Sequence, residues 1–191
     1  MDRIGEGLSF VFLLLTVMNI SASPYPFLLV LAYAVHEAGH FVLARITGAG
    51  ISGFKASLMR LCIKYDCTRI SYLKEALVCG GGIIFNLVLF AIFAAPVFDF
   101  NEKIRLFAVY NLSLGLLNLY PVAVLDGGGI LRCLANGLLR EETAQKVINV
   151  ASFLFAFLLW LMAVYLQLMF SSDISLLFIS IFLMLQLCFS H

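Results

Sequence analysis

The feature that most constrains this chain is a succession of apolar segments, each long enough to cross a lipid bilayer. Of its 191 residues, 63% are hydrophobic and 12% are charged, whereas apolar residues make up roughly half of a soluble domain. A transmembrane helix needs about 20 residues to cross about 30 Å of hydrocarbon. We therefore expect an all-α polytopic membrane protein that forms a single domain over residues 1–191. This criterion predicts about six spans, at residues 4–20, 25–46, 73–97, 104–120, 147–170 and 174–189.

The basic residues predict the orientation of these spans, because lysine and arginine are enriched in cytoplasmic loops. With a cytoplasmic N-terminus, only Lys103 and Arg105 lie outside. The other ten of the 12 basic residues then lie inside: Arg3, Arg45, Lys55, Arg60, Lys64, Arg69, Lys74, Arg132, Arg140 and Lys146. Both termini are therefore expected in the cytoplasm. The first span has a second interpretation, since residues 8–18 are short enough for the core of a cleaved signal peptide.

The loop between the second and third spans has its own pattern. Apolar and polar residues alternate within residues 51–65, and glycines lie near the start. Such alternation is typical of a β-hairpin, although an unstructured basic loop fits the pattern equally well. We expect a small β-hairpin that lies against the membrane surface.

The second span contains His36-Glu37-Ala38-Gly39-His40. Two histidines four residues apart lie on the same face of a helix, so both imidazoles can reach one metal ion. Glu37 is then placed to take a proton from water at that metal rather than to bind the ion. Ionisable residues within a span are costly and usually functional. The alternative is structural: the histidines hydrogen-bond to neighbouring helices, and Glu37 is protonated or paired.

A third ligand is expected, because a catalytic zinc site usually has three protein ligands and one open position. The one remaining histidine is the terminal His191, so the third ligand should be a carboxylate. Asp126 directly follows a span and precedes three consecutive glycines, which permit a tight reversal and a close backbone approach. The alternative is that Asp126 caps a helix over residues 129–139. The histidine pair favours the ligand interpretation.

These residues resemble the site-2 protease family of intramembrane metalloproteases. The family pairs His-Glu-x-x-His with a later Asn-x-x-Pro-x-x-x-Leu-Asp-Gly segment, and every position of the second pattern is filled at residues 118–127. The resemblance implies that His36, His40 and Asp126 bind one zinc ion per chain. It implies that Glu37 is the catalytic base.

Four further residues match positions of the family's motifs. The resemblance places Asn118 and Pro121 beside the active site, where an unwound substrate segment enters, although Pro121 fits equally well as a helix terminator. Gly82 and Asn86 are similar to a glycine and an asparagine at the start of the span after the hairpin. Asn86 could hold water or an oxyanion in catalysis, or make an interhelical hydrogen bond. We favour the hydrogen bond or a supporting role.

The resemblance covers about residues 25–139, a three-span catalytic core. Within the family, the resemblance is closest to the small branch that includes the sporulation sigma-factor processing proteases (stage IV sporulation protein FB-like). We expect this chain to have neither a PDZ domain nor a C-terminal nucleotide-sensing domain.

This resemblance implies an intramembrane zinc endopeptidase of a bacterial cytoplasmic membrane, with its active site towards the cytoplasmic leaflet. The substrate would be a membrane-tethered regulatory protein, such as a sigma-factor precursor. Further expected partners are the lipid bilayer and a membrane-bound regulatory or inhibitory protein, but no nucleic acid. The alternative is a membrane metal-ion transporter that uses the same histidines and aspartate.

Overall fold

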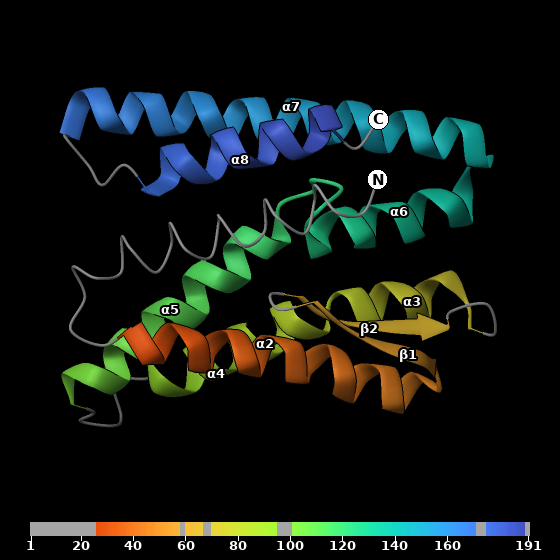
Figure 1. The fold of residues 1–191 in the computed structure, drawn as a ribbon, viewed down its shortest axis with the longest axis horizontal. Coiled ribbons are helices and arrows are strands. Elements are labelled where there is room, and N and C mark those ends of the chain that lie inside the picture. Colours follow the sequence, from red (N-terminus) through yellow and green to blue (C-terminus); the bar gives the residue numbers. More distant parts are fainter. Residues whose placement is uncertain (1–25, 58–59, 67–69, 95–100, 171–174, 190–191) are drawn as a thin grey trace.

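The structure, a computed structural model, describes residues 26–57, 60–66, 70–94, 101–170 and 175–189 (Figure 1). The predicted first span lies outside these residues. The described part of the chain is mostly helical, with a two-stranded hairpin. Its elements are α2 (Pro26–Thr47), β1 (Gly50–Ser57), β2 (Arg60–Asp66), α3 (Tyr72–Cys79), α4 (Gly81–Phe93), α5 (Glu102–Leu119), α6 (Asp126–Leu138), α7 (Glu141–Phe170) and α8 (Ser175–Phe189).

The helices lie in two groups that α5 connects. Figure 1 shows α7 and α8 side by side along one edge, α2 with α4 along the opposite edge, and α5 running obliquely between them. α2 packs against α3, α4 and α5, while α6 packs against α3 and α7. The start of α6 therefore lies between the two groups, close to the helices that pack on α2.

α2 matches the predicted span over residues 25–46. It has 22 residues, or about 33 Å of helix, and it is long and apolar enough to cross a membrane. A proline at its first position suits a helix start. At its end, Gly48 has a φ of 79° and the Ala49 N–H donates to the Ala44 carbonyl at 3.0 Å. This is the usual way in which a glycine in the left-handed conformation ends a helix.

The other predicted spans differ in how well they match. α7 contains residues 147–170 and is also long and apolar enough to cross. α3 and α4 together cover most of residues 73–97, but they are bent by 48° at Gly80. α5 nearly coincides with residues 104–120, but three of its first four residues are charged, and the 15 residues of α8 reach only about 22 Å. The described residues thus support two spans, or three if the bent pair is one span, and six spans stay a prediction.

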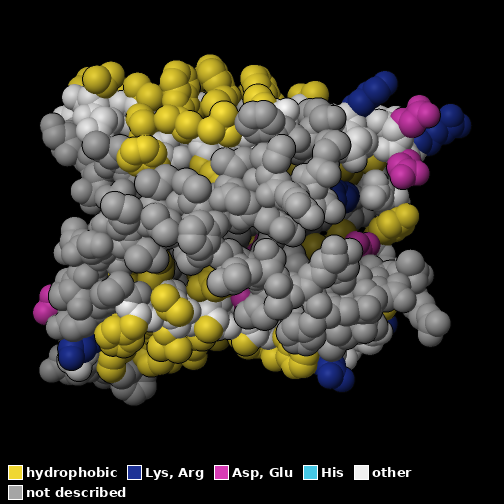
Figure 2. Space-filling view, in the orientation of Figure 1, with side chains coloured by type: hydrophobic (Ala, Val, Ile, Leu, Met, Phe, Trp, Pro, Cys, Tyr) yellow, Lys and Arg dark blue, Asp and Glu magenta, His cyan; other side chains and the backbone are white. Residues whose placement is uncertain are grey.

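The outer surface of the helices is strongly apolar (Figure 2). On α7, for example, Val150, Phe153 and Leu168 are 68%, 61% and 79% exposed. Charged side chains gather near the start of α7, at one end of the molecule. An apolar surface of this extent suits lipid better than water. The surface and the apolar helices support an integral membrane protein.

β1 and β2 form an antiparallel hairpin, with Gly50 opposite Asp66 and Ser57 opposite Arg60. This is the stretch in which alternating residues predict a hairpin. Its position against a membrane surface stays a prediction. The hairpin connects α2, which carries both histidines, to α3.

The start of α6 differs from expectation. The helix begins at Asp126, with Leu125 at the N-cap position, so the glycine run continues as a helix and does not reverse the chain. The predicted helix over residues 129–139 therefore begins three residues earlier, and Asp126 lies in its first turn rather than capping it. The glycines serve close approach rather than a reversal of the chain, since a Cβ on Gly127 would collide with the Leu119 carbonyl.

Candidate active site

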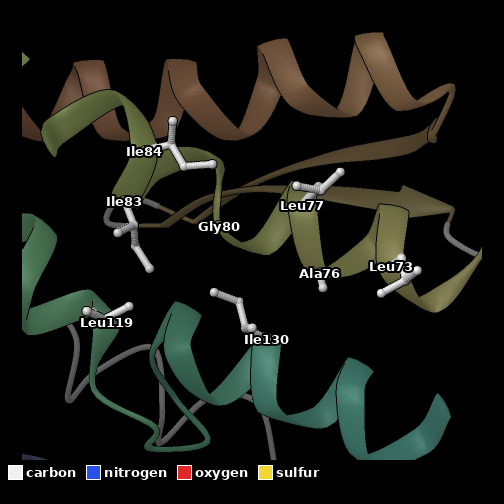
Figure 3. A pocket seen from close by; sticks show the side chains of 8 residues that line it. All are labelled: Leu73, Ala76, Leu77, Gly80, Ile83, Ile84, Leu119 and Ile130. Carbon is white, nitrogen blue, oxygen red and sulfur yellow. The ribbon is translucent and has the colours of Figure 1, made fainter. Parts of the chain in front are cut away.

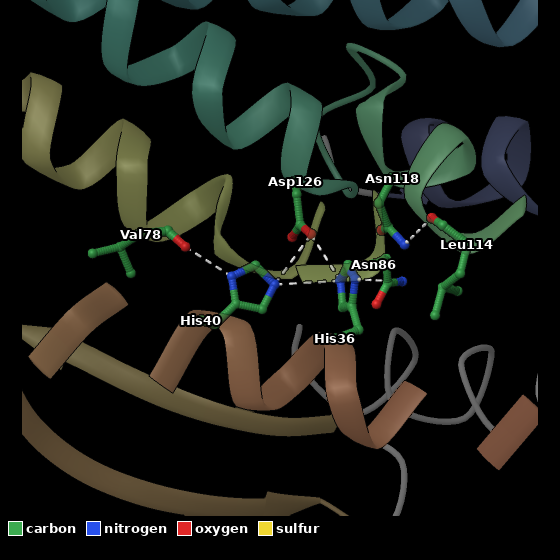
Figure 4. Close-up of polar contacts among 7 residues, drawn as sticks. All are labelled: His36, His40, Val78, Asn86, Leu114, Asn118 and Asp126. Carbon is green, nitrogen blue, oxygen red and sulfur yellow. Dashed lines mark hydrogen bonds and ion pairs between the residues drawn. The ribbon is translucent and has the colours of Figure 1, made fainter. Parts of the chain in front are cut away.

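Two histidine side chains of α2 meet one aspartate at the start of α6 (Figure 4). His36 Nε2 and His40 Nε2 lie 2.9 and 3.1 Å from Asp126 Oδ2, and the two Nε2 atoms are 3.3 Å apart. The side chains of His36, His40 and Asp126 are 4%, 12% and 24% exposed. The fold thus brings together the three side chains that the sequence predicts as metal ligands.

The ring of His40 is oriented by α3. Its Nδ1 lies 2.8 Å from the Val78 carbonyl oxygen, and because a carbonyl only accepts, the imidazole donates this hydrogen bond. The Val78 carbonyl lies in the last turn of α3, where carbonyls lack the N–H partner four residues further along the helix. A neutral His40 therefore directs the lone pair of Nε2 at the other two side chains. Metal-binding histidines usually donate their second ring N–H in this way.

The ring of His36 is oriented by α4. Its Nδ1 lies 3.3 Å from Asn86 Nδ2, and the Asn86 side chain is fully buried. In this orientation of the amide, Asn86 Oδ1 is buried and has no partner. Turning the amide by half a rotation, which leaves its shape unchanged, lets Oδ1 accept from a protonated Nδ1. His36 Nε2 is then also free to bind a metal.

Gly82 gives His36 the space that its ring occupies. A Cβ on Gly82 would lie 2.5 Å from His36 Cε1 and 2.6 Å from both ring nitrogens. One turn further along α2, a Cβ on Gly81 would lie 2.6 Å from the Gly39 carbonyl oxygen. Small residues on both helices therefore let α2 and α4 approach closely, as is common between membrane helices.

The three converging atoms fit a bound zinc ion better than a set of hydrogen bonds. Two imidazole nitrogens and a carboxylate oxygen that all present lone pairs repel one another unless a cation or a proton lies between them. Zinc–ligand bonds of about 2.0–2.1 Å place the ligand atoms of a tetrahedral site about 3.3 Å apart. The observed separations of 2.9 to 3.3 Å are close to this value. The donor set and its spacing therefore fit zinc.

The remaining predicted residues lie near this cluster. Glu37 follows His36 on α2 and is half-buried, and no residue of the described part forms a hydrogen bond or ion pair with it. The Asn118 amide donates to the Leu114 carbonyl of α5 at 3.0 Å, and Figure 4 shows Asn118 on the same side of the cluster as Asp126. α5 ends at Leu119, as expected for a helix followed closely by a proline. The roles of Glu37, Asn118 and Pro121 stay predictions.

An apolar pocket of about 470 Å³ adjoins the site, between the α3–α4 bend and α6 (Figure 3). Ile83, Leu119 and Ile130 point towards one another across it. Because the lining is apolar, its side chains offer no metal ligand and no proton acceptor. The lining residues are Leu73, Ala76, Leu77, Gly80, Ile83, Ile84, Leu119 and Ile130.

Comparisons with known proteins match part of the chain by sequence and most of it by fold. A model of Peptidase family M50 matches residues 89–162, a stretch that contains Asp126 but neither histidine. Among solved structures, the site-2 protease from Methanocaldococcus jannaschii is similar, with a TM-score of 0.56 and 21% identity over 94% of this chain and 86% of that chain. No curated protein matches. The family model thus covers 74 of the 191 residues, and the solved structure shares the fold of this chain.

Proposed function

We propose that this protein is a zinc endopeptidase that hydrolyses a peptide bond in or next to a transmembrane segment of a membrane-tethered substrate. The observation that carries the proposal is the convergence of His36 Nε2, His40 Nε2 and Asp126 Oδ2 on one point. These three residues would hold the zinc ion, one per chain. Because the cluster is built by helices of a membrane protein, its substrate must reach it within or beside the bilayer.

Bound zinc would supply Lewis acidity, which polarises the scissile carbonyl and makes water a better nucleophile. Glu37, next to the first ligand on α2, takes the proton from water and passes it to the leaving amine. Val78 and Asn86 hold the two imidazoles in the orientation that ligation needs. Asn118 and Pro121 would lie beside the path of the unwound substrate segment, and Gly82 leaves the space that His36 fills.

The product would be released into the cytoplasm. Ten of the 12 basic residues lie on one side if both termini are cytoplasmic, which agrees with the usual enrichment of lysine and arginine there. Arg45, in the last turn of α2, is five residues beyond His40, or about 8 Å of helix. The site would therefore lie in the cytoplasmic leaflet. This orientation favours a regulatory protein, such as a sigma-factor precursor, as the substrate. The membrane would be a bacterial cytoplasmic membrane, and a membrane-bound partner would regulate the protease.

Glu37→Gln tests the proposal, because it removes the base and leaves all three ligands. Cleavage should fall at least about 100-fold, the usual contribution of general acid–base catalysis, while the purified variant keeps its zinc. The measurement compares membrane proteomes of cells that carry the wild type or the variant. One membrane protein with a single span or a hairpin anchor should accumulate uncut.

Glu102→Gln is the matched control, since Glu102 is an exposed carboxylate at the far end of α5. It should cleave at the wild-type rate. Full turnover by Glu37→Gln, or metal flux that this variant retains in vesicles, would contradict the protease and favour a metal-ion transporter.

A further inference from the structure

The loop that leads to Asp126 rests on a helix that contributes no side chain to the site. Residues 120–125 connect α5 to α6. Within this loop, the Ala123 N–H donates to the hydroxyl oxygen of Ser152 on α7 at 2.9 Å. Ser152 is fully buried. The bond therefore links the loop to a helix 29 residues further along the chain.

Two apolar contacts hold the same loop on the same helix. The ring of Tyr120 packs edge-on against Phe155 of α7, with 5.7 Å between the ring centroids. Val122 is fully buried in a cluster with residues of α7 and α8, namely Ala156, Leu159 and Leu183. The loop is thus fixed on α7 by one hydrogen bond and two side chains.

The position of the loop determines the position of Asp126. The Leu125 N–H donates to the Val122 carbonyl at 2.8 Å, and the Gly129 N–H donates to the Leu125 carbonyl at 3.1 Å. In the same turn, a Cβ on Gly128 would collide with the Val122 carbonyl. Asp126 therefore begins a helical turn that is in direct contact with the loop, and a shift of the loop moves the carboxylate relative to both histidines.

Ser152 and a second buried serine, Ser180, make different kinds of hydrogen bond. Helical serines commonly donate to a carbonyl of their own helix, as Ser180 of α8 does to Leu177 at 2.8 Å. Both serines are fully buried. The Ser152 oxygen instead accepts from the Ala123 N–H in the loop. Ser152 thus satisfies a backbone group beside a proposed metal ligand.

We propose that Ser152 is a positioning residue for the metal site, which acts on Asp126 through the loop of residues 120–125. This inference rests on the proposed function, because it treats Asp126 as a zinc ligand. It gives α7 a role beyond crossing the membrane: the helix sets where the third ligand stands.

Cobalt(II) binding by the full chain in detergent tests this inference. Ser152→Ala should weaken cobalt(II) affinity about 10-fold, the lower end of what supporting residues contribute to metal sites. It should also change the visible absorption of the bound ion and speed hydrogen exchange in residues 120–125. Ser152→Cys, with a sulfur that accepts more weakly, should give an intermediate affinity. Ser180→Ala removes a hydroxyl with equal burial and should match the wild type.

The outcomes separate this inference from the proposed function. If Ser152→Ala matches Ser180→Ala in cobalt(II) affinity, spectrum and loop exchange, Ser152 has no positioning role, whatever the change in melting temperature. A wild type that does not bind cobalt(II) overturns the proposed function and this inference with it. If the wild type binds cobalt(II) and both Ser152→Ala and Ser152→Cys bind it as tightly as the wild type does, this inference alone is overturned.

Discussion

At the scale of single residues, the position of His36 depends on the absence of a side chain at Gly82. A methyl group there would stand 2.5 Å from the imidazole, and the ring is buried. Gly82→Ala should therefore displace His36 and lower zinc affinity about 10- to 100-fold, as loss of a supporting contact does at other metal sites. Competition with a chelator measures this affinity.

Gly137→Ala makes the same change where space exists. Gly137 is exposed on α6, and its Cβ would lie 3.6 Å from the nearest atom, Cδ2 of Tyr72. Alanine is also the better helix former, by up to about 1 kcal/mol. This variant should fold at least as well as the wild type and bind zinc equally. Equal zinc affinity of the two alanine variants would refute the steric role of Gly82.

The sequence predicts the residues of the site whose side chains carry their chemistry. His36, His40 and Asp126 are recognisable because ionisable groups are rare among apolar residues, and the structure places them together. Val78 gives no such signal, because it acts through its main-chain carbonyl. Ser152 gives none either, since a serine within a long apolar helix carries no information about which backbone group it meets.

At the scale of helices and strands, the apolar pattern predicts where most elements lie but not how they bend. Residues 73–97 are predicted as one span, yet α3 and α4 meet at an angle of 48°. The glycines at 80–82 indicate a close approach, but the bend itself depends on contact with α2 and α6. The glycines in α6 are helical and lie against the loop before them, where a Cβ on Gly127 or Gly128 would collide with a loop carbonyl.

Asn86 couples two of these helices, because it lies on α4 and contacts His36 on α2. Asn86→Ala removes the group that orients the imidazole, and we expect zinc affinity to fall about 10-fold. Asn111→Ala is the control: Asn111 is equally buried, but its amide donates to the Phe107 carbonyl of its own helix. Both variants should lose stability, and only the first should lose zinc affinity. Equal affinities would reduce Asn86 to a packing role.

At the scale of the whole molecule, composition predicts a membrane protein, and the apolar helices agree with it. The number of spans is harder to predict, because charged residues open α5 and α8 is short. The orientation rests on the distribution of basic residues. A reporter that fluoresces only in the cytoplasm should fluoresce when it is fused after His191. A fusion that is present in the membrane but dark would contradict the predicted orientation.

The measurement that tests the central claim most directly is the zinc content of the purified chain, wild type against Asp126→Ala. The three converging atoms predict one zinc ion per chain in the wild type, and loss of that zinc on dialysis once the carboxylate is removed. A wild type that purifies without zinc and does not take it up, or an Asp126→Ala variant that holds it as firmly as the wild type, would contradict the account.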